Sequence, residues 1–410
     1  LKKIILLNFL VLFLISVISY IYGSLFLTMF PDFVDAENRI IIKNFQFDYG
    51  ELLHSLYYDN EYNQPNDGPI WSQILPTFTN LLLNISLDFY IFIILKNTLL
   101  FTILNLSILY FAKKFNLKFK EYLIILLLFL YNPYNLHVLL NFNFADSYNS
   151  FLIPIFFLMI LINNKKSVLI GSTVIFLLYL SKSFLFLICI FYPLIDFIFS
   201  KFFKKNITLI NFKFISLSLG VLAAVLSWGF FGKVNANYFP IGSNASSYNS
   251  YALSSMLNED FKNIYPEKSV DYLLDETIFD QISFGNEKDF YNFFNEKNKN
   301  YIKNNSISYL NDMKIKIYFI FFSLLKDGQE LDDVSQLRYS NIFNKPLLIL
   351  SIIVSSYLFL IKRDEFSFQF LLITTLYLTP LIIGWATNKH LVPIFLISKI
   401  YLFLIYAKKN

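Results

Sequence analysis

The chain has 410 residues, of which 56% are hydrophobic, 20% are aromatic and only 15% are charged. This composition lies outside the range of ordinary soluble domains and is typical of a polytopic membrane protein. The net charge of +5 does not indicate nucleic-acid binding, because the lysines are spread over short segments between apolar runs. The single cysteine, Cys189, excludes a disulfide or a thiolate metal site within one chain.

The first apolar run covers residues 4–27, which is longer than the roughly 20 residues that a helix needs to cross a bilayer. Lys2 and Lys3 precede this run and no small-residue cleavage site follows it, so we expect a retained signal-anchor helix. A polar stretch, residues 28–88, is expected to form the first outer loop. Within it, residues 69–85 are moderately apolar and predict a helix that lies along the membrane interface.

Further apolar runs predict a total of about ten membrane spans. With this number, every lysine pair between the runs falls on the side of the N-terminus, which the positive-inside rule assigns to the cytoplasm. Both termini are then expected to be cytoplasmic. The further runs are residues 89–112, 122–140, 151–162, 167–180, 184–199, 212–231, 345–360, 368–385 and 391–406.

A hydrophilic region, residues 232–344, separates two groups of spans. It is long enough to fold as a small domain, which we expect to be mainly helical and to lie on the outer, periplasmic side. Its apolar piece, residues 315–325, is too short to cross a membrane. The sequence therefore predicts an all-α polytopic membrane protein with an N-terminal transmembrane module, residues 1–231, this loop domain, and C-terminal transmembrane helices, residues 345–410.

Three carboxylates and an arginine follow the first span directly, namely Asp32, Asp35, Glu37 and Arg39. Transfer of a sugar to a hydroxyl group needs a base that takes the proton of the acceptor, and a partly desolvated carboxylate suits that role. The alternative interpretation is that these acids end the first helix and face water. We take the acidic cluster as the main candidate for a catalytic site.

Other charged side chains are expected on the outer side. Lys182 lies between two spans, where positive charge is normally avoided, and Lys96 lies near the outer end of its span. Each is a candidate for holding a phosphate, and the alternative for each is a side chain that reaches the interface. Lys389 and His390, in the last outer turn, are candidates for contact with a lipid phosphate. Asp146, in a short outer loop, is a second acidic site, a metal ligand or a helix N-cap.

No short motif in the chain indicates a metal or nucleotide site. The three histidines are scattered, so a zinc site is not predicted. Walker, GxGxxG, GxSxG and HExxH motifs do not occur in the sequence, which argues against a nucleotide-driven transporter domain within it.

The order of these features resembles the GT-C glycosyltransferases, in particular the bacterial relatives of the dolichyl-phosphate-mannose protein mannosyltransferases and the aminoarabinose and lipopolysaccharide-core transferases. The segment VDAENRI, residues 34–40, is similar to the acidic motif that follows the first helix in that family. NDGPIWSQILPTF, residues 66–78, resembles the Gly-Pro stretch before its interfacial helix. The hairpin around Lys182 and the stretch from Lys389 to Pro393 are also similar to family motifs.

The resemblance implies a GT-C-like bundle in a bacterial inner membrane and a polyprenyl-phosphate sugar as the donor. The donor phosphate would be held among Arg39, Lys96, Lys182 and Lys389. The acceptor, which is a glycan, a lipid or a protein, would enter from the periplasm and lose its hydroxyl proton to Asp35, with inversion at the anomeric carbon. No cofactor is firmly implied, and the need for a divalent cation stays open.

The chain departs from the family pattern in two respects. The acidic pair of the family is split here by Ala36, which leaves open whether Asp35 or Glu37 is the base. Several arginines of the family are lysines in this chain, and that exchange is not neutral at a phosphate, because arginine binds it with a planar pair of donors.

Two other membrane functions fit the same outline. An O-antigen polymerase or ligase also has a large periplasmic loop but relies on arginines there, and this loop offers only Arg338. A flippase for lipid-linked oligosaccharides is expected to bury charges within its spans or to show inverted repeats. We find no repeat, and we expect the charged residues to lie at the ends of the spans. An inactive relative whose outer domain binds a partner is a further alternative.

Overall fold

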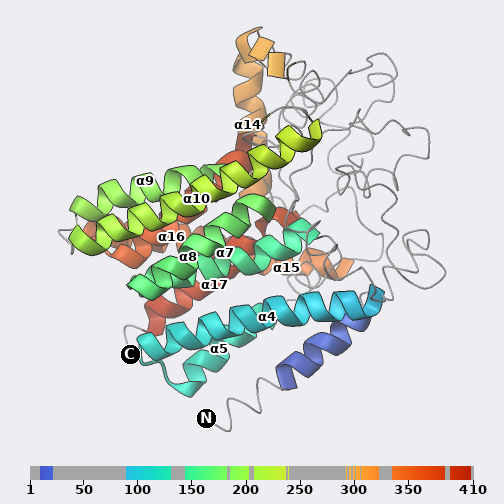
Figure 1. Cartoon of the computed structure of the whole chain (residues 1–410), viewed down its shortest axis with the longest axis vertical. Helices are drawn as coiled ribbons and strands as arrows, with labels where there is room; N and C mark the ends of the chain where they lie inside the picture. The colour runs from blue at the N-terminus through green and yellow to red at the C-terminus, as the bar shows by residue number, and fades with distance from the viewer. Residues whose placement is uncertain are drawn as a thin grey trace.

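A computed structural model describes the chain as a bundle of helices, and no strand occurs among the residues it describes (Figure 1). Most of the bundle comes from the regions before residue 237 and after residue 334. The described residues are 10–21, 89–130, 144–181, 185–202, 207–236, 239, 292, 295–296, 299–300, 302–304, 306–322, 335–383 and 388–407.

Every predicted span that falls within these residues contains a helix. The first is the helix Leu10–Ile21, which carries no label in Figure 1. The labelled helices are α4 (Phe89–Lys114), α5 (Phe119–Leu130), α7 (Phe144–Ile162), α8 (Lys165–Ser181), α9 (Phe186–Phe202), α10 (Ile207–Ala236), α14 (Ser306–Phe321), α15 (Ser335–Lys362), α16 (Glu365–Ile383) and α17 (Asn388–Ala407).

Within the described regions, four helices have segments long and apolar enough to cross a membrane. These segments indicate a membrane protein, and its described part is helical throughout its regular structure. The total of about ten spans and the outer loop domain stay predictions. The four segments are Ile94–Lys114, Ile207–Phe230, Phe343–Lys362 and Glu365–Ile383.

The helices α7 and α17 form the centre of the bundle. Residues 147–162 of α7 and 391–401 of α17 are buried throughout, because α4, α8 and α16 pack around α7 while α5, α15 and α16 pack around α17. A helix that is apolar on all sides belongs in such a core. The outer helices instead expose apolar stripes, which in a membrane protein face lipid. On α10 this stripe is Ile215, Leu219, Leu222, Leu226 and Phe230.

The helices α8 and α10 approach each other closely at Gly220. A Cβ atom at this position would lie 2.5 Å from the backbone oxygen of Ser172. The hydroxyl of Ser172 also donates a hydrogen bond of 2.5 Å to the carbonyl of Ser216, one turn before Gly220. Small residues four positions apart allow two membrane helices to come this close.

Three connections at one end of the bundle are tight turns between antiparallel helices. In each turn, a residue one or two positions after the end of the preceding helix has a positive φ. These residues are Asn116 (52°), Asn163 (49°) and Arg363 (52°). A residue in this left-handed conformation commonly ends a helix. Directly after two of these turns, the side chains of Asn164 and Asp364 cap α8 and α16 by accepting backbone N–H groups of the first turn.

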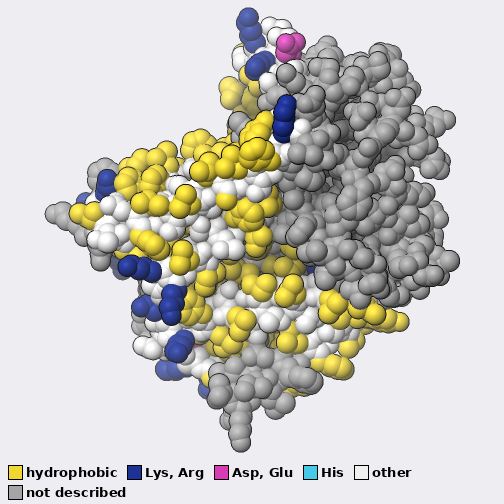
Figure 2. Space-filling model, in the orientation of Figure 1, with side chains coloured by type: hydrophobic (Ala, Val, Ile, Leu, Met, Phe, Trp, Pro, Cys, Tyr) yellow, Lys and Arg dark blue, Asp and Glu magenta, His cyan; other side chains and the backbone are white. Residues whose placement is uncertain are grey.

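We call the end of the bundle that holds these three turns the lysine end. The rings of Phe115 and Phe366 join the end of α4 to the start of α16 there, with their centroids 5.4 Å apart. Figure 2 shows Lys and Arg side chains gathered along this end, at the left of the view, and hydrophobic side chains over the middle. The lysines of the turns and adjoining helix ends are Lys113, Lys114, Lys118, Lys120, Lys165, Lys166, Lys201 and Lys362.

Two helices continue past predicted domain boundaries, although their apolar segments, Ile207–Phe230 and Phe343–Lys362, end within two residues of those boundaries. The boundary at residue 231 falls inside α10, which continues to Ala236, and the boundary at residue 345 falls inside α15, which begins at Ser335. The apolar runs mark the part of each helix suited to lipid, whereas a helix continues into water for as long as its backbone hydrogen bonds can form.

Candidate functional site

The structure describes the predicted site residues unequally. Lys96 is described in full. Asp146 belongs to the first turn of α7, and Lys389 and His390 belong to the first turn of α17, while their side chains lie outside the description. The remaining predicted residues lie outside the described residues altogether, namely Asp32, Asp35, Glu37, Arg39 and Lys182.

The position of Asp146 corrects one expectation. We predicted it in a short outer loop before the apolar run 151–162, but α7 already begins at Phe144. The helix starts about two turns before the predicted run, because the residues at positions 144–150 can also adopt a helical conformation. Asp146 is therefore a residue of the first helical turn, where a carboxylate interacts favourably with the helix dipole.

Lys96 is buried near the start of α4, with 1% of its surface exposed. Its ammonium lies 3.3 Å from the hydroxyl oxygen of Ser147, to which it donates a hydrogen bond. It also lies 5.9 Å from the centre of the Tyr148 ring, close enough for a cation–π interaction. The lysine thus points from α4 toward the first turns of α7. Burying an ammonium in a membrane helix is costly, so its surroundings must offset that cost.

The residue that follows, Asn97, points to a different helix. Its amide donates a hydrogen bond of 2.9 Å to the hydroxyl of Ser19, at the end of the helix Leu10–Ile21, and both side chains are buried. One position further along, the hydroxyl oxygens of Thr98 and Ser16 lie 3.3 Å apart. We call the residues Lys96, Asn97, Ser19, Ser147 and Tyr148 the Lys96 cluster.

Besides α4, the helix α8 also contacts the first turns of α7. Ser181, the last residue of α8, donates a hydrogen bond of 2.6 Å to the side-chain oxygen of Asn149. Ser147 directly follows Asp146 in the sequence, and Ser181 directly precedes Lys182. The first turns of α7 therefore join α4 to α8, and the contacts are made by the sequence neighbours of two predicted site residues.

The chemistry of this region favours a bound anion. The N-terminus of a helix carries backbone N–H groups and the positive end of the helix dipole. Lys96 adds a basic amine beside the first turns of α7, and the hydroxyl of Ser147 contacts it. This combination is the usual protein environment of a phosphate.

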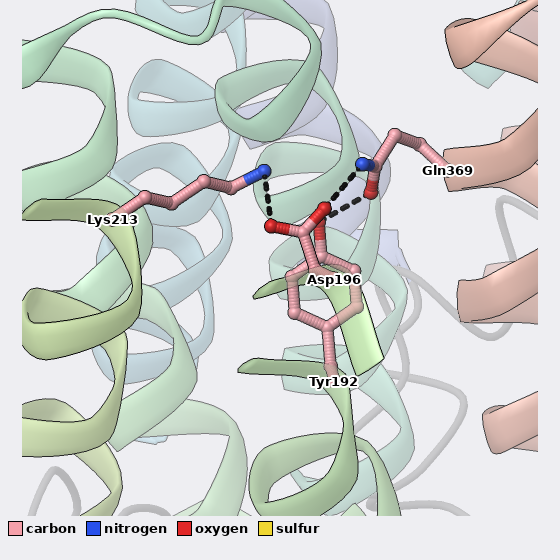
Figure 3. A network of polar contacts seen from close by, with 4 residues as sticks. All are labelled: Tyr192, Asp196, Lys213 and Gln369. Carbon is pink, nitrogen blue, oxygen red and sulfur yellow. Dashed lines mark hydrogen bonds and ion pairs between the residues drawn. The ribbon is translucent and has the colours of Figure 1, made fainter. Parts of the chain in front are cut away.

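A second polar group lies nearer the lysine end, and Figure 3 shows its four residues. The ammonium of Lys213 on α10 lies 2.9 Å from one carboxylate oxygen of Asp196 on α9. The other oxygen accepts a hydrogen bond of 2.5 Å from the amide of Gln369 on α16. The hydroxyl of Tyr192 donates to the side-chain oxygen of Gln369. We call these residues the Asp196 network, and all four are buried.

The two charges of this network lie close to the ends of the predicted runs 184–199 and 212–231. The expectation that charges lie at the ends of the spans fails at Lys399, which is buried in the middle of the run 391–406. Asp196 and Lys213 lie within α9 and α10, at equal sequence distances from the connection between them. Lys345 on α15 and Lys399 on α17 are further buried charges within helices. The signal that could have revealed the pair was the placement of opposite charges at the same depth of one predicted hairpin, where they compensate each other.

In the described part of the chain, no group of three His, Cys, Asp or Glu side chains could hold a metal ion. The acidic cluster lies outside that part, so the divalent cation stays an open prediction. Comparison with known proteins adds no assignment, because no family model, curated protein or solved structure matches this chain.

Proposed function

We propose that the protein is an integral membrane glycosyltransferase of the GT-C type that takes a sugar from a polyprenyl-phosphate donor. The observation that carries the proposal is the buried ammonium of Lys96 beside the N-terminus of α7. An apolar helix tolerates such a charge where an anion is bound at the membrane surface. A lipid-linked sugar phosphate brings an anion to that depth.

In this proposal, basic side chains hold the phosphate throughout the reaction. The phosphate carries the negative charge of the donor and gains charge as the sugar departs, so positive groups placed beside it stabilise the transition state. Lys96 supplies one such group at the start of α4. The others are Arg39, Lys182, Lys389 and His390.

The reaction proceeds by direct displacement. The hydroxyl oxygen of the acceptor forms a bond to the anomeric carbon while the bond from that carbon to the phosphate oxygen breaks. The hydroxyl proton passes to a carboxylate, either Asp35 or Glu37, and the polyprenyl phosphate leaves. Attack from the face opposite the phosphate inverts the anomeric carbon. Asp32 and Asp146 supply further carboxylates near the site.

We also propose the membrane sidedness that goes with this reaction. The lysine end lies in the cytoplasm, in agreement with the positive-inside rule, and both termini lie on that side. The Lys96 cluster then faces the periplasm of a bacterial plasma membrane. The acceptor, which is a lipid, a glycan or a protein, reaches the site from the periplasm.

The proposal is tested by transfer of radiolabelled sugar from a panel of polyprenyl-phosphate sugars, with the purified protein in native lipid. The wild type is expected to release sugar from one donor. Asp35→Asn and Glu37→Gln identify the base, because the substitution that removes it abolishes transfer. Lys96→Met is expected to weaken use of the donor, since methionine fills the same space without the charge.

Lys113→Met is the matched control, because this lysine lies on the same helix but is exposed at the lysine end. Its transfer rate should equal that of the wild type. If no donor is consumed, or if Lys96→Met transfers sugar as fast as Lys113→Met, the proposed function is wrong.

A flippase for lipid-linked oligosaccharides is a second candidate, and the Asp196 network favours it. Charged residues within membrane helices are rare and often mark the substrate or ion pathway of a transporter. Fluorescent polyprenyl-phosphate sugar in proteoliposomes separates the two functions. A flippase equilibrates the label between leaflets without consuming it, whereas the transferase cleaves it. An O-antigen polymerase or ligase would instead consume lipid-linked oligosaccharide.

A further inference from the structure

The hydrogen bond between Ser19 and Asn97 lies directly beside the lysine that carries the proposed function. Asn97 follows Lys96 on α4, and the two side chains leave the helix in different directions. Lys96 reaches Ser147 on α7, while Asn97 reaches Ser19 on the helix Leu10–Ile21. One turn of α4 is therefore held from two sides by polar contacts to two other helices.

The contact belongs to a regular stripe on the first helix. Val11, Ile15 and Ser19 are four residues apart and are all buried, so they share one face. The opposite face exposes apolar residues such as Phe13 and Leu14. Two apolar side chains and one hydroxyl thus face the bundle, and the hydroxyl meets the amide of Asn97.

Apolar contacts between membrane helices do not by themselves select one register, because lipid tails are as apolar as the side chains. A buried hydrogen bond does select a register, since a helix that slides or turns leaves an amide without a partner in an apolar environment. The bond from Asn97 to Ser19 therefore fixes the rotation and depth of the first turns of α4.

We infer that Ser19 and Asn97 are positioning residues for Lys96: their hydrogen bond holds α4 in the rotation that directs the ammonium to the start of α7. This role rests on the proposed function, because its consequence is binding of the donor phosphate. Loss of the bond lets α4 turn and moves the ammonium away from the phosphate. The chemical step, which other residues perform, is unaffected once the donor is bound.

The kinetic test uses Ser19→Ala in the full-length protein in native lipid. We expect the KM for the polyprenyl-phosphate donor to rise roughly threefold to tenfold, which corresponds to loss of one hydrogen bond within a membrane, while kcat stays the same. Ser19→Thr keeps a hydroxyl and should restore the KM. Ser107→Ala is the matched control, because it removes a buried hydroxyl of α4 that bonds within its own helix.

A second measurement reports the register without any sugar. Cysteines at positions 16 and 98, whose hydroxyl oxygens lie 3.3 Å apart, should form a disulfide readily under mild oxidation. Adding Ser19→Ala to this double variant should slow the cross-link, while adding Ser107→Ala should not. The native Cys189 is buried, so it does not compete.

The inference is overturned if Ser19→Ala leaves the donor KM unchanged, or if the cross-link forms as fast as before. It is also overturned if Ser19→Ala lowers kcat in place of raising KM. Wild-type protein that consumes no donor would refute the proposed function and this role together. Wild-type transfer with unchanged kinetics in Ser19→Ala would refute the positioning role and leave the proposed function standing.

Discussion

The Lys96 cluster and the Asp196 network both bury a lysine in a membrane bundle, but they differ in what surrounds the charge. Lys213 lies against a carboxylate whose second oxygen is also bonded, so the network is closed by four side chains from three helices. Lys96 lies against a hydroxyl and an aromatic ring at the N-terminus of a helix. The first arrangement pairs two opposite charges, whereas the second places a lysine beside a hydroxyl group and a ring at the first turns of a helix.

The difference shows that a buried charge by itself does not identify an active site. A lysine with a nearby acid at the same depth has its charge compensated within the protein and can serve to join helices. A lysine beside a helix N-terminus, as at Lys96, is the arrangement from which we propose a phosphate site. The partners and the position along the helix therefore decide the interpretation.

The largest expected effect comes from breaking the charge pair. Asp196→Ala leaves the ammonium of Lys213 buried without its carboxylate, which should destabilise the protein by about 3–5 kcal/mol. Unfolding in mixed detergent, followed by circular dichroism, measures this change. The double variant Asp196→Leu with Lys213→Met should recover most of the lost stability, because neither charge is then buried. If the double variant were as unstable as Asp196→Ala, the uncompensated charge of Lys213 would not be the cause of the lost stability.

Removing the charge of Lys96 should affect activity rather than stability. A charge-assisted hydrogen bond is worth about 1.5–3 kcal/mol, so Lys96→Met should lower kcat/KM for sugar transfer roughly tenfold to a hundredfold. The free energy of unfolding should stay the same or rise, because methionine is buried more cheaply than an ammonium. A large loss of stability in Lys96→Met would make the Lys96 cluster resemble the Asp196 network and weaken the contrast.

The contact between α8 and α10 at Gly220 links the Lys96 cluster to the Asp196 network. Adding one methyl group there should destabilise the protein. Gly220 lies on α10, the helix that carries Lys213, and it packs against α8. The last residue of α8, Ser181, in turn donates a hydrogen bond to Asn149 in the first turns of α7. In Gly220→Ala, the added Cβ would lie 2.5 Å from a backbone oxygen, so α8 and α10 must separate. We expect a loss of about 1–3 kcal/mol in unfolding free energy. Gly171→Ala, where the nearest atom is 3.6 Å away, is the control and should change stability little.

The smallest effect is expected from the hydroxyl of Tyr192, which belongs to the Asp196 network through Gln369. Tyr192→Phe removes the hydroxyl that donates to Gln369 but keeps the ring beside Phe156. We expect a loss of about 0.6–1.7 kcal/mol, as for single hydrogen bonds within membrane bundles. Detergent unfolding again gives the value. A loss as large as that of Asp196→Ala would mean that the tyrosine controls the charge pair itself.

Much of the fold could be predicted because lipid selects long apolar runs, and each described run contains a helix. The ends of the helices could not, since α10 and α15 continue through polar residues that carry no apolar signal. The capped turns at Asn163 and Arg363 depend on backbone conformation, which the residue types there indicate weakly.

The candidate site was predictable only in part. Lys96 was selected as a candidate because a lysine inside an apolar run is conspicuous, and the structure shows that it is buried. Asn97 and Ser19 were missed, since asparagine and serine are frequent in this chain and their role depends on which helices become neighbours. Asp196 and Lys213 were missed because their one signal in the sequence, equal distance from the connection of a predicted hairpin, does not show the rotation of the two helices that brings them together.

The placement of Asp196 and Lys213 on consecutive helices also bears on biogenesis. Neither α9 nor α10 can enter the bilayer by itself without carrying an uncompensated charge, so the two helices should leave the translocon as a pair, already neutral. Gln369 is synthesised much later than this pair, and its amide completes the carboxylate's bonding only when α16 arrives. A ribosome stalled between α10 and α16 should therefore hold an inserted hairpin whose acid still has one oxygen to satisfy, which makes that interval the vulnerable stage of assembly.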